Sequence, residues 1–510
     1  MDIKEHGIFT QNLLRSLGTD EKTQLIETHI STIILSGDLA YKLKKPVDFG
    51  FLDYSTLEKR YKNSLEEVRI NEGFAPELYL GVIPITGSIE DPRIDGEGRV
   101  LDHAVKMRRF EQNCQLDNMV DEGRLDMDLM DKAAQMIAAF HKRTEAAAPQ
   151  SEFGAPVRVL APMEENFELL KAVGSFQAKI DVVERWTYDG YKRFKPLLKS
   201  RKENGFIREC HGDMHLHNMA MFEGKLIMFD AIEFNPYLNH IDVISDLAFL
   251  LMDLEYRSLH QLSRRVLNRY LELTGDYEGV RVLDFYKTYR AMVRAKVAAL
   301  RASQDMLESE RQSVMDEVER YIDLALSYTR EKEPFMAITH GCSGSGKSTF
   351  AQMLVETHGA LRIRSDAERM RMFERSDESG LEEGIYTPDT TKATYERLLE
   401  LAVSVYEAGY SVIVDATFLK QWQRRLFIEH ASTAEAPFCL FTMACDHEVM
   451  RSRVEHRSEE GSDISEADLE VLQLQIKSAE PLSESEREVE VTIDCSSTAS
   501  MRQSAARIMQ

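Results

Sequence analysis

The chain has 510 residues, of which 43% are hydrophobic and 29% charged, so at roughly 100–200 residues per domain it has enough apolar material for several folded domains. Glycine and proline occur in ordinary numbers, 26 and 13, which excludes a collagen-like or wholly disordered protein. The net charge of −23 disfavours nucleic acid and anionic membranes as partners, because both normally require a basic surface.

The N-terminal sequence lacks the basic and then apolar pattern of a signal peptide. The longest strongly apolar run, residues 247–252, is too short to span a bilayer. None of the six cysteines forms a CxxC pair, which indicates reduced thiols rather than a disulfide framework. We therefore expect a cytoplasmic protein, and the sequence gives no indication of its oligomeric state.

Residues 24–107 have the β-rich runs and turns of a small, mostly antiparallel sheet with one helix. The expected elements are strands at 24–27, 32–35, 39–44, 78–84 and 100–107, and a helix at 55–73 opened by Ser55 or Thr56. From residue 126 the pattern becomes mainly helical, with helices expected at 127–143, 163–173, 179–199 and within 240–330.

A charged run at 330–333 followed by Pro334 predicts the end of a helix and a domain boundary. The first predicted domain is therefore 1–333, with a small lobe over about 1–108 and a helical lobe over about 109–333. The second is 334–510, where strand and helix patterns alternate. Strands are expected at 335–339, 361–364, 411–415, 438–444 and 489–494, and helices at 347–357, 390–408, 420–431, 447–457 and 466–478. This alternation predicts an α/β domain with a parallel sheet wrapped by helices.

The second domain opens with a glycine-rich motif of the form GxxxxGK[ST], placed between an apolar strand and a helix. It consists of Gly341, Cys342, Ser343, Gly344, Ser345, Gly346, Lys347 and Ser348, and Thr349 follows it. The glycines let successive backbone N–H groups turn toward one anion, and the helix N-terminus adds its positive end. Lys347 is expected to reach the outer phosphates of a nucleotide and Ser348 to hold Mg²⁺.

Other residues of this domain are candidates for the same site. Asp366 follows the predicted strand 361–364, at the sheet edge that faces the ligand crevice. Asp415 ends the predicted strand 411–415 and is a candidate for the Mg²⁺ shell. Arg451, Arg453 and Arg457 share a late helix and are candidates to clamp phosphate as a lid. The alternative for these arginines is a solvated helix face.

A second motif lies in the first domain, where residues 211–218 read HGDxxxxN and a strand ending in Asp230 follows. Phosphoryl transfer needs a carboxylate beside the attacking hydroxyl, an amide oxygen on Mg²⁺ and a second carboxylate on Mg²⁺. Asp213, Asn218 and Asp230 fit these roles in that order. The alternative is a zinc site formed by the three histidines of this stretch together with Asp213, which leaves Asn218 and Asp230 without a function. We expect a structural role for His211.

The segment 341–494 resembles the P-loop kinase family, near its zeta-toxin-like, gluconate-kinase-like and polynucleotide 5′-kinase-like branches. The stretch 463–468 resembles the region after the arginine lid of bacterial members. The resemblance implies that Asp366 is the general base for the acceptor hydroxyl and that Arg369 helps to bind the substrate. The alternative for Asp366 is an N-cap of a helix that begins at Ala367.

Residues 25–255 resemble the aminoglycoside phosphotransferase-like family, which has the protein-kinase fold. The resemblance implies that Lys42 binds phosphate, or Lys44 if the alignment slips by two residues. It implies that Glu66 or Glu67 pairs with that lysine and that residues 107–110 form the adenine-binding hinge. The chain departs from protein kinases because it lacks a GxGxxG loop before Lys42 and an activation-loop motif after Asp230. Glu233 is a candidate for a further Mg²⁺ ligand or a structural carboxylate, and Asp242 and Asp246 are expected to be structural.

The order of the two domains resembles a bacterial family that fuses an aminoglycoside phosphotransferase-like domain to a P-loop kinase domain. The resemblance implies an ATP-dependent kinase, with GTP as the alternative nucleotide and with Mg²⁺, that phosphorylates hydroxyls of small molecules at two sites. Two other hypotheses remain at this point. One domain is a nucleotide-sensing module, or the C-terminal domain is a polynucleotide 5′-kinase, which its acidic charge disfavours.

Overall fold

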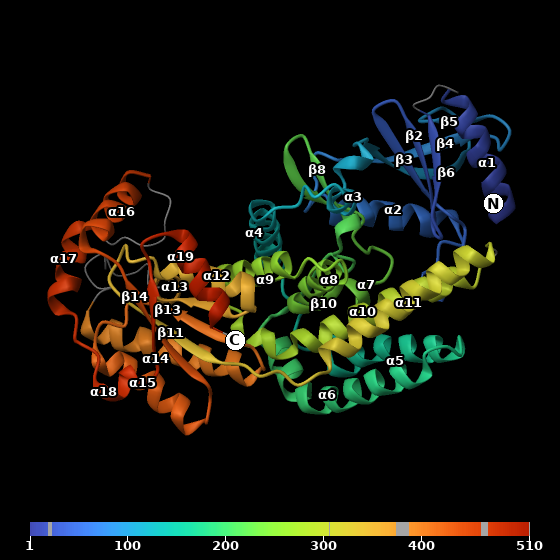
Figure 1. Cartoon of the computed structure of the whole chain (residues 1–510). Helices are drawn as coiled ribbons and strands as arrows, with labels where there is room; N and C mark the ends of the chain where they lie inside the picture. The colour runs from blue at the N-terminus through green and yellow to red at the C-terminus, as the bar shows by residue number, and fades with distance from the viewer. Residues whose placement is uncertain (19–22, 51, 305, 374–386, 461–467, 509–510) are drawn as a thin grey trace. The chain divides into compact units, whose positions relative to one another are not determined.

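The computed structural model describes residues 1–18, 23–50, 52–304, 306–373, 387–460 and 468–508 (Figure 1). The chain divides into two compact units. Unit 1 comprises Met1–Arg257 and Phe285–Leu326, and unit 2 comprises Ser258–Asp284 and Ser327–Gln510. This division differs from a single boundary after residue 333, because the segment 258–284 packs with the second unit.

Unit 1 opens with a sheet of six antiparallel strands in the order β1-β2-β3-β6-β4-β5 and the helices α1 and α2. These elements are α1 Ile3–Ser16, β1 Gln24–Glu27, β2 Ser31–Ser36, β3 Leu39–Lys44, α2 Leu57–Asn71, β4 Tyr79–Gly87, β5 Pro92–Ile94 and β6 Val100–Arg108. Thr56 caps α2 by accepting a hydrogen bond from the Lys59 N–H at 3.2 Å. Because side chains alternate along a strand, Lys42 and Lys44 of β3 point to the same face.

The rest of unit 1 is mainly helical, with two small β-ribbons that hold its loops. Its elements are η1 Gln112–Cys114, α3 Leu116–Asp121, α4 Met127–Arg143, α5 Pro156–Ala172, α6 Gln177–Glu203, β7 Ile207–Glu209, η2 Leu216–Asn218, β8 Met219–Phe222, β9 Lys225–Met228, α7 Pro236–Asn239, β10 His240–Asp242, α8 Val243–Tyr256, α10 Leu283–Ala302 and α11 Glu308–Tyr328. Nearly every side chain of α8 from Val243 to Leu254 is buried, so this helix forms the centre of the helical part.

Unit 2 contains a five-stranded parallel sheet in the order β12-β13-β11-β14-β15. Its elements are α9 His260–Thr274, η3 Tyr277–Val282, β11 Met336–His340, α12 Lys347–His358, β12 Leu361–Arg364, α13 Ser365–Phe373, α14 Pro388–Glu407, β13 Val412–Asp415, α15 Gln421–Thr433, β14 Phe438–Ala444, α16 His447–Glu460, α17 Leu469–Ser478, α18 Glu484–Arg487, β15 Glu490–Asp494 and α19 Thr498–Arg507. Helices α12 and α19 pack together, as do α14 and α15, and both pairs contact the sheet (Figure 1). The carboxyl ends of the strands therefore meet at one edge, which is where ligands bind in such sheets.

Helix α9 is an integral part of unit 2. Its Arg264 donates to the carbonyl oxygens of Glu356 and Thr357 at 2.9 and 2.8 Å, at the C-terminal end of α12 where carbonyls lack partners within the helix. Glu272 is buried at 4% exposure, and its carboxylate lies 2.9 Å from Arg362 and 3.4 Å from Arg364 of β12. The segment 258–284 thus fixes the strand that leads to Asp366.

The predicted two-part architecture is confirmed: an antiparallel sheet with a mainly helical part is followed by a parallel sheet wrapped by helices. The expected elements agree with the structure to within a few residues, except that α5 begins earlier than expected. The structure also contains elements that were not predicted, namely α1, β5, α3, β7, β8, α7, β10, α13, α18 and α19. The resemblance drawn for 463–468 and the first two residues of the helix expected at 466–478 fall outside the described residues, save Asp468. None of the described helices is both long enough and apolar enough to cross a lipid bilayer.

The pairing of Glu272 predicts a stability effect. Burial acts to raise the pKa of Glu272, but Arg362 and Arg364 outweigh it and lower that pKa. Glu272→Ala leaves these arginines without their buried partner, and we expect it to lower the free energy of unfolding by about 3 kcal/mol at pH 7 in urea titrations of the full chain. Because the folded-state pKa is lowered, the stabilisation is present above the unfolded value of about 4.3 and is lost as the pH falls through the folded value.

The exposed Glu278 of η3 gives a matched control, since Glu278→Ala removes a carboxylate in the same segment and is expected to change stability by less than about 0.5 kcal/mol. Equal effects of the two substitutions would show that the pairing of Glu272 with Arg362 and Arg364 does not hold α9 in place.

Candidate active sites

The HGDxxxxN loop of unit 1 is held in shape by two buried carboxylates of α8. Asp246 accepts hydrogen bonds from the backbone N–H groups of His211 at 3.0 Å and Gly212 at 2.8 Å. Asp253 accepts one from the N–H of Leu216 at 3.0 Å. The His211 ring contacts the carbonyl oxygen of Phe229 at 2.9 Å, so this histidine and Asp246 have the structural roles predicted for them.

Asp213 and Asn218 lie against each other within this loop. The Asn218 side-chain nitrogen donates to the Asp213 carboxylate and to its carbonyl oxygen, both at 3.0 Å. This leaves the amide oxygen of Asn218, the atom predicted to bind Mg²⁺, for another partner. Burial acts to raise the pKa of Asp213, but His215 at 3.3 Å and the more distant Arg294 outweigh it, so the pKa lies well below its usual range. Asp213 is therefore ionised at neutral pH.

Both lysines of β3 pair with Glu67, and neither pairs with Glu66. The Glu67 carboxylate is fully buried, and its two oxygens accept from Lys42 at 2.8 Å and from Lys44 at 2.7 Å. Glu66 lies on the exposed side of α2 and pairs with Arg69. The prediction of Glu66 as a lysine partner is therefore wrong, because a helix turns adjacent residues about 100° apart and only Glu67 faces the sheet.

Lys42 also contacts the carboxylate of Asp230, which brings the strand, the helix and the loop after β9 together. Burial acts to lower the pKa of Lys42, but Asp230 and Glu67 outweigh it and raise that pKa well above its usual value. Asp230 has a left-handed backbone with φ of 63°, and its N–H donates to the Tyr79 hydroxyl at 3.1 Å. Its side chain remains 46% exposed, so it is accessible to a ligand.

The zinc alternative has no support in the described part of unit 1. Within the described residues, the metal-ligating atoms that gather closely belong instead to His141, Cys210 and Asp246, which are all buried. Asp246 is occupied there by the two loop N–H groups and by His141 at 3.2 Å. Within this group, Asp246 serves to fix the HGDxxxxN loop.

In unit 2, the P-loop runs from the end of β11 into α12 as predicted. Gly344 and Gly346 have φ values of 78° and 98°, which only glycine adopts readily. A Cβ on Gly344 would lie 2.6 Å from the Met450 carbonyl oxygen of α16, so this position also requires close backbone approach. The Lys347 ammonium donates to the Cys342 carbonyl oxygen at 2.8 Å, and the Ser343 N–H donates to Gln475 at 2.7 Å.

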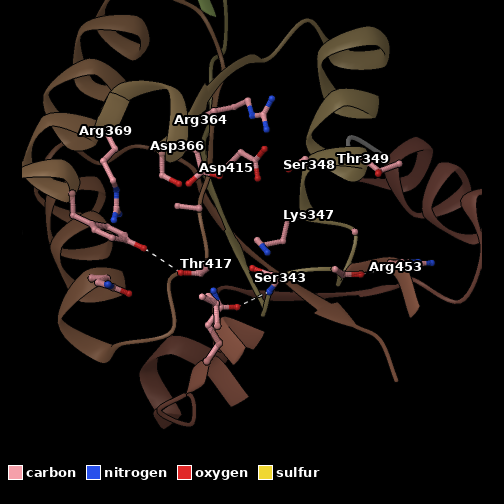
Figure 2. A pocket seen from close by; sticks show the side chains of 18 of the residues that line it. Ser343, Lys347, Ser348, Thr349, Arg364, Asp366, Arg369, Asp415, Thr417 and Arg453 are labelled. Atoms are coloured by element: carbon pink, nitrogen blue, oxygen red, sulfur yellow. Dashed lines mark hydrogen bonds between the residues drawn. The ribbon is translucent and has the colours of Figure 1, made fainter. Parts of the chain in front are cut away.

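The P-loop faces a cavity of about 670 Å³ at the carboxyl edge of the sheet. Predicted site residues that line it are Ser343, Gly344, Gly346, Lys347, Ser348, Thr349, Asp366, Arg369, Asp415 and Arg453. Figure 2 shows Asp366 and Asp415 as neighbours, with Lys347 further along the cavity towards Arg453. Gly341, Cys342 and Ser345 contribute to the loop but do not line the cavity; Cys342 packs against α16 and α17.

The two carboxylates of the cavity lie in surroundings unlike those of ordinary surface acids. Burial, and then the nearby charge of Asp415, raise the pKa of Asp366 above its usual value. One oxygen of Asp415 is buried and has no hydrogen-bond partner among the described residues. An unpaired buried carboxylate oxygen in the cavity that Ser348 also lines fits a hard cation such as Mg²⁺. Asp366 lies inside α13, which begins at Ser365, so the alternative that it caps a helix beginning at Ala367 is wrong.

The three lid arginines have different positions. Arg453 lines the cavity and donates to the carbonyl oxygens of Gly344 at 3.3 Å and Cys495 at 3.1 Å, so it braces the P-loop. Arg451 is exposed and is not among the described cavity-lining residues, which corrects its prediction as a phosphate clamp. The side chain of Arg457 lies outside the described residues.

Several residues of the cavity were not predicted. Gln475 of α17 binds the Ser343 N–H, and Tyr395 of α14 contacts Thr417 and accepts from the Phe418 N–H at 3.3 Å. Arg364 at the end of β12 lines the cavity while Glu272 pairs with it. Their helices and strands were predicted, but no motif marks these positions.

Similar proteins were found at the level of structure and of sequence. A sugar kinase from Janibacter sp. HTCC2649 is 21% identical, with a TM-score of 0.28, over 34% of this chain and 94% of that chain. A choline/ethanolamine kinase family protein from Mesorhizobium loti is 9% identical, with a TM-score of 0.37, over 63% of this chain and 99% of that chain. A family model described as "AAA domain" matches residues 336–482, which confirms the predicted P-loop resemblance of the C-terminal part.

Two relatives span most of the chain. "Uncharacterized protein Rv2004c" of Mycobacterium tuberculosis is 30% identical over 447 residues, which are 86% of this chain and 86% of the relative. "Uncharacterized protein Mb2027c" of Mycobacterium bovis matches with the same identity and coverage. The match extends over far more of the chain than the P-loop part alone. The chain therefore belongs to the protein family that these mycobacterial sequences represent.

Proposed function

We propose that the protein is an ATP-dependent phosphotransferase with two nucleotide sites, each of which transfers the γ-phosphoryl group of ATP to a hydroxyl of a small molecule. The observation that carries this proposal is that each unit brings together its own phosphate-binding residues and its own candidate catalytic carboxylate. In unit 1, Lys42, Glu67 and Asp230 meet near the Asp213 loop. In unit 2, the P-loop and Asp366 face one cavity.

At the N-terminal site the residues divide the work of phosphoryl transfer. Lys42, oriented by Glu67, neutralises charge on the ATP phosphates. Asp213 is ionised and accepts the proton of the attacking hydroxyl, while the bond from Asn218 fixes its carboxylate. Phosphoryl transfer depends mainly on the positioning of the reacting groups and on charge. The buried hydrogen bonds that hold this loop against α8 are therefore part of the proposed mechanism.

At the C-terminal site the backbone N–H groups of the P-loop and the N-terminus of α12 hold the phosphates, and Lys347 reaches the transferred group. Asp366 orients the acceptor hydroxyl and takes its proton. Its raised pKa brings it closer to the working pH, which favours proton transfer. Arg369, one helical turn further along α13, binds the acceptor from the same cavity wall.

Magnesium fits the donor set of both sites. Asn218 and Asp230 would hold it in unit 1, and Ser348 and Asp415 in unit 2. When bound, Mg²⁺ supplies positive charge to the phosphates of ATP. The acidic net charge of the chain favours a small-molecule acceptor over nucleic acid, because a nucleic-acid substrate normally requires a basic surface.

The first test concerns Asp213 in a chain whose C-terminal site is disabled by Lys347→Ala. Asp213→Asn keeps the shape but removes the base, so we expect transfer from γ-labelled ATP to a panel of hydroxyl metabolites to fall at least about 10²-fold. The affinity for ATP should persist, because Asp213 does not hold the nucleotide. The exposed Asp189, changed to Asn, is the control. Undiminished transfer by Asp213→Asn would contradict the assignment.

The second test separates a kinase from a simple ATPase in unit 2, with the N-terminal site disabled by Asp213→Asn. Asp366→Ala should abolish transfer to the acceptor while ATP affinity stays within a few-fold of the parent chain, because the P-loop is intact. Arg369→Ala should mainly raise the KM of the acceptor. Exposed Glu396, changed to Ala, is the control. ATP binding without transfer in the parent chain would favour the nucleotide-sensing alternative.

A further inference from the structure

Unit 1 contains a second lysine cluster directly beside the one that the proposed reaction uses. The Lys44 ammonium is 1% exposed and contacts Glu67 at 2.7 Å, the Tyr54 hydroxyl at 3.3 Å and the carboxylate of Glu233. The Tyr54 hydroxyl also donates to Glu233. Burial, and then Glu233, raise the pKa of Tyr54, so its hydroxyl keeps the proton that it donates. All four side chains are buried.

Lys42 and Lys44 share Glu67 but differ in their second partner. Each takes one oxygen of Glu67, so the carboxylate is held from both sides. The second partner of Lys42 is Asp230, which is 46% exposed. The second partner of Lys44 is Glu233, whose side chain is only 5% exposed. Lys42 therefore pairs with the exposed carboxylate of the loop, while Lys44 pairs with a buried carboxylate three residues further along the same loop.

The loop 230–233 is attached to fixed groups at every residue. The N–H of Asp230 donates to the Tyr79 hydroxyl at 3.1 Å, and that of Ala231 donates to the Asn71 side chain at 3.0 Å. The N–H of Ile232 donates to the His211 carbonyl oxygen at 2.9 Å. Among these attachments, Lys44 with Glu233 forms the buried ion pair between the loop and β3. The unusual left-handed backbone of Asp230 persists because the surroundings fix it.

We propose that Lys44, Tyr54 and Glu233 form a positioning cluster that presents the Asp230 carboxylate to Mg²⁺·ATP at the N-terminal site and keeps Glu67 in place when Lys42 turns to the phosphates. The inference rests on the proposed function of this site. It assigns Glu233 to positioning rather than to metal binding, because the Lys44 ammonium and the Tyr54 hydroxyl occupy its carboxylate in a buried environment. Carboxylates and cations that orient a metal ligand in this way affect metal affinity without touching the metal.

The experiment measures binding of a fluorescent ATP analogue to the full chain carrying Lys347→Ala, with Mg²⁺ and with EDTA. The ratio of the two affinities reports how well Asp230 is presented. Glu233→Gln keeps the shape but removes the charge that Lys44 holds, and we expect it to reduce this Mg²⁺-dependent gain about 10–100-fold. Affinity in EDTA should change little. Glu223→Gln, which removes an exposed carboxylate of the same unit, is the control and should leave the ratio unchanged.

Two further variants keep the test decisive. Lys44→Met should give a similar loss, and combining it with Glu233→Gln should add little, because both act through one contact. If Glu233→Gln does not fold, Tyr54→Phe removes one hydrogen bond to Glu233 and should reduce the Mg²⁺-dependent gain several-fold.

A lowered melting temperature with an unchanged Mg²⁺-dependent gain, in Glu233→Gln or in Tyr54→Phe, would overturn the inference and show a purely structural cluster. A parent chain that binds no ATP would overturn the proposed function of this site and the inference with it.

Discussion

Glu67 lies fully buried between Lys42 and Lys44, and the N-terminal site depends on this arrangement. A buried carboxylate is costly unless it is paired and hydrogen-bonded, so the requirement to satisfy Glu67 fixes helix α2 against strand β3. Each lysine then connects to the loop after β9, one through Asp230 and the other through Glu233. The need to pair one buried charge thus determines where the groups of the proposed reaction lie.

The same constraint recurs in both units. Asp246, buried in α8, is satisfied by two N–H groups of the HGDxxxxN loop and thereby sets its shape. Glu272, buried in α9, is satisfied by Arg362 and Arg364 and thereby holds the strand that leads to Asp366. In each case a buried carboxylate outside the proposed reaction fixes a segment that carries residues of that reaction. The cavity of unit 2 shows the opposite situation, because a buried oxygen of Asp415 has no partner in the part of the chain that the structure describes and is suited to a cation.

The sequence predicted the elements that carry a local pattern. The alternation at 39–44 and the glycine motif at 341–348 depend on neighbours in the chain, so both were placed correctly. The choice between Glu66 and Glu67 was not predictable, because it depends on which face of α2 meets β3. The roles of Lys44 and Glu233 and the packing of α9 with unit 2 depend on contacts between distant segments, which no spacing in the sequence records.

The proposed function requires that one chain carry two separate nucleotide sites. Calorimetric titration of the full chain with a non-hydrolysable ATP analogue and Mg²⁺ counts these sites. We expect two bound nucleotides per chain, and one each after Lys347→Ala or Asp230→Ala, because these substitutions act in different units. A single nucleotide bound by the unaltered chain, or the loss of both sites after either substitution, would show that the chain does not carry two independent nucleotide sites.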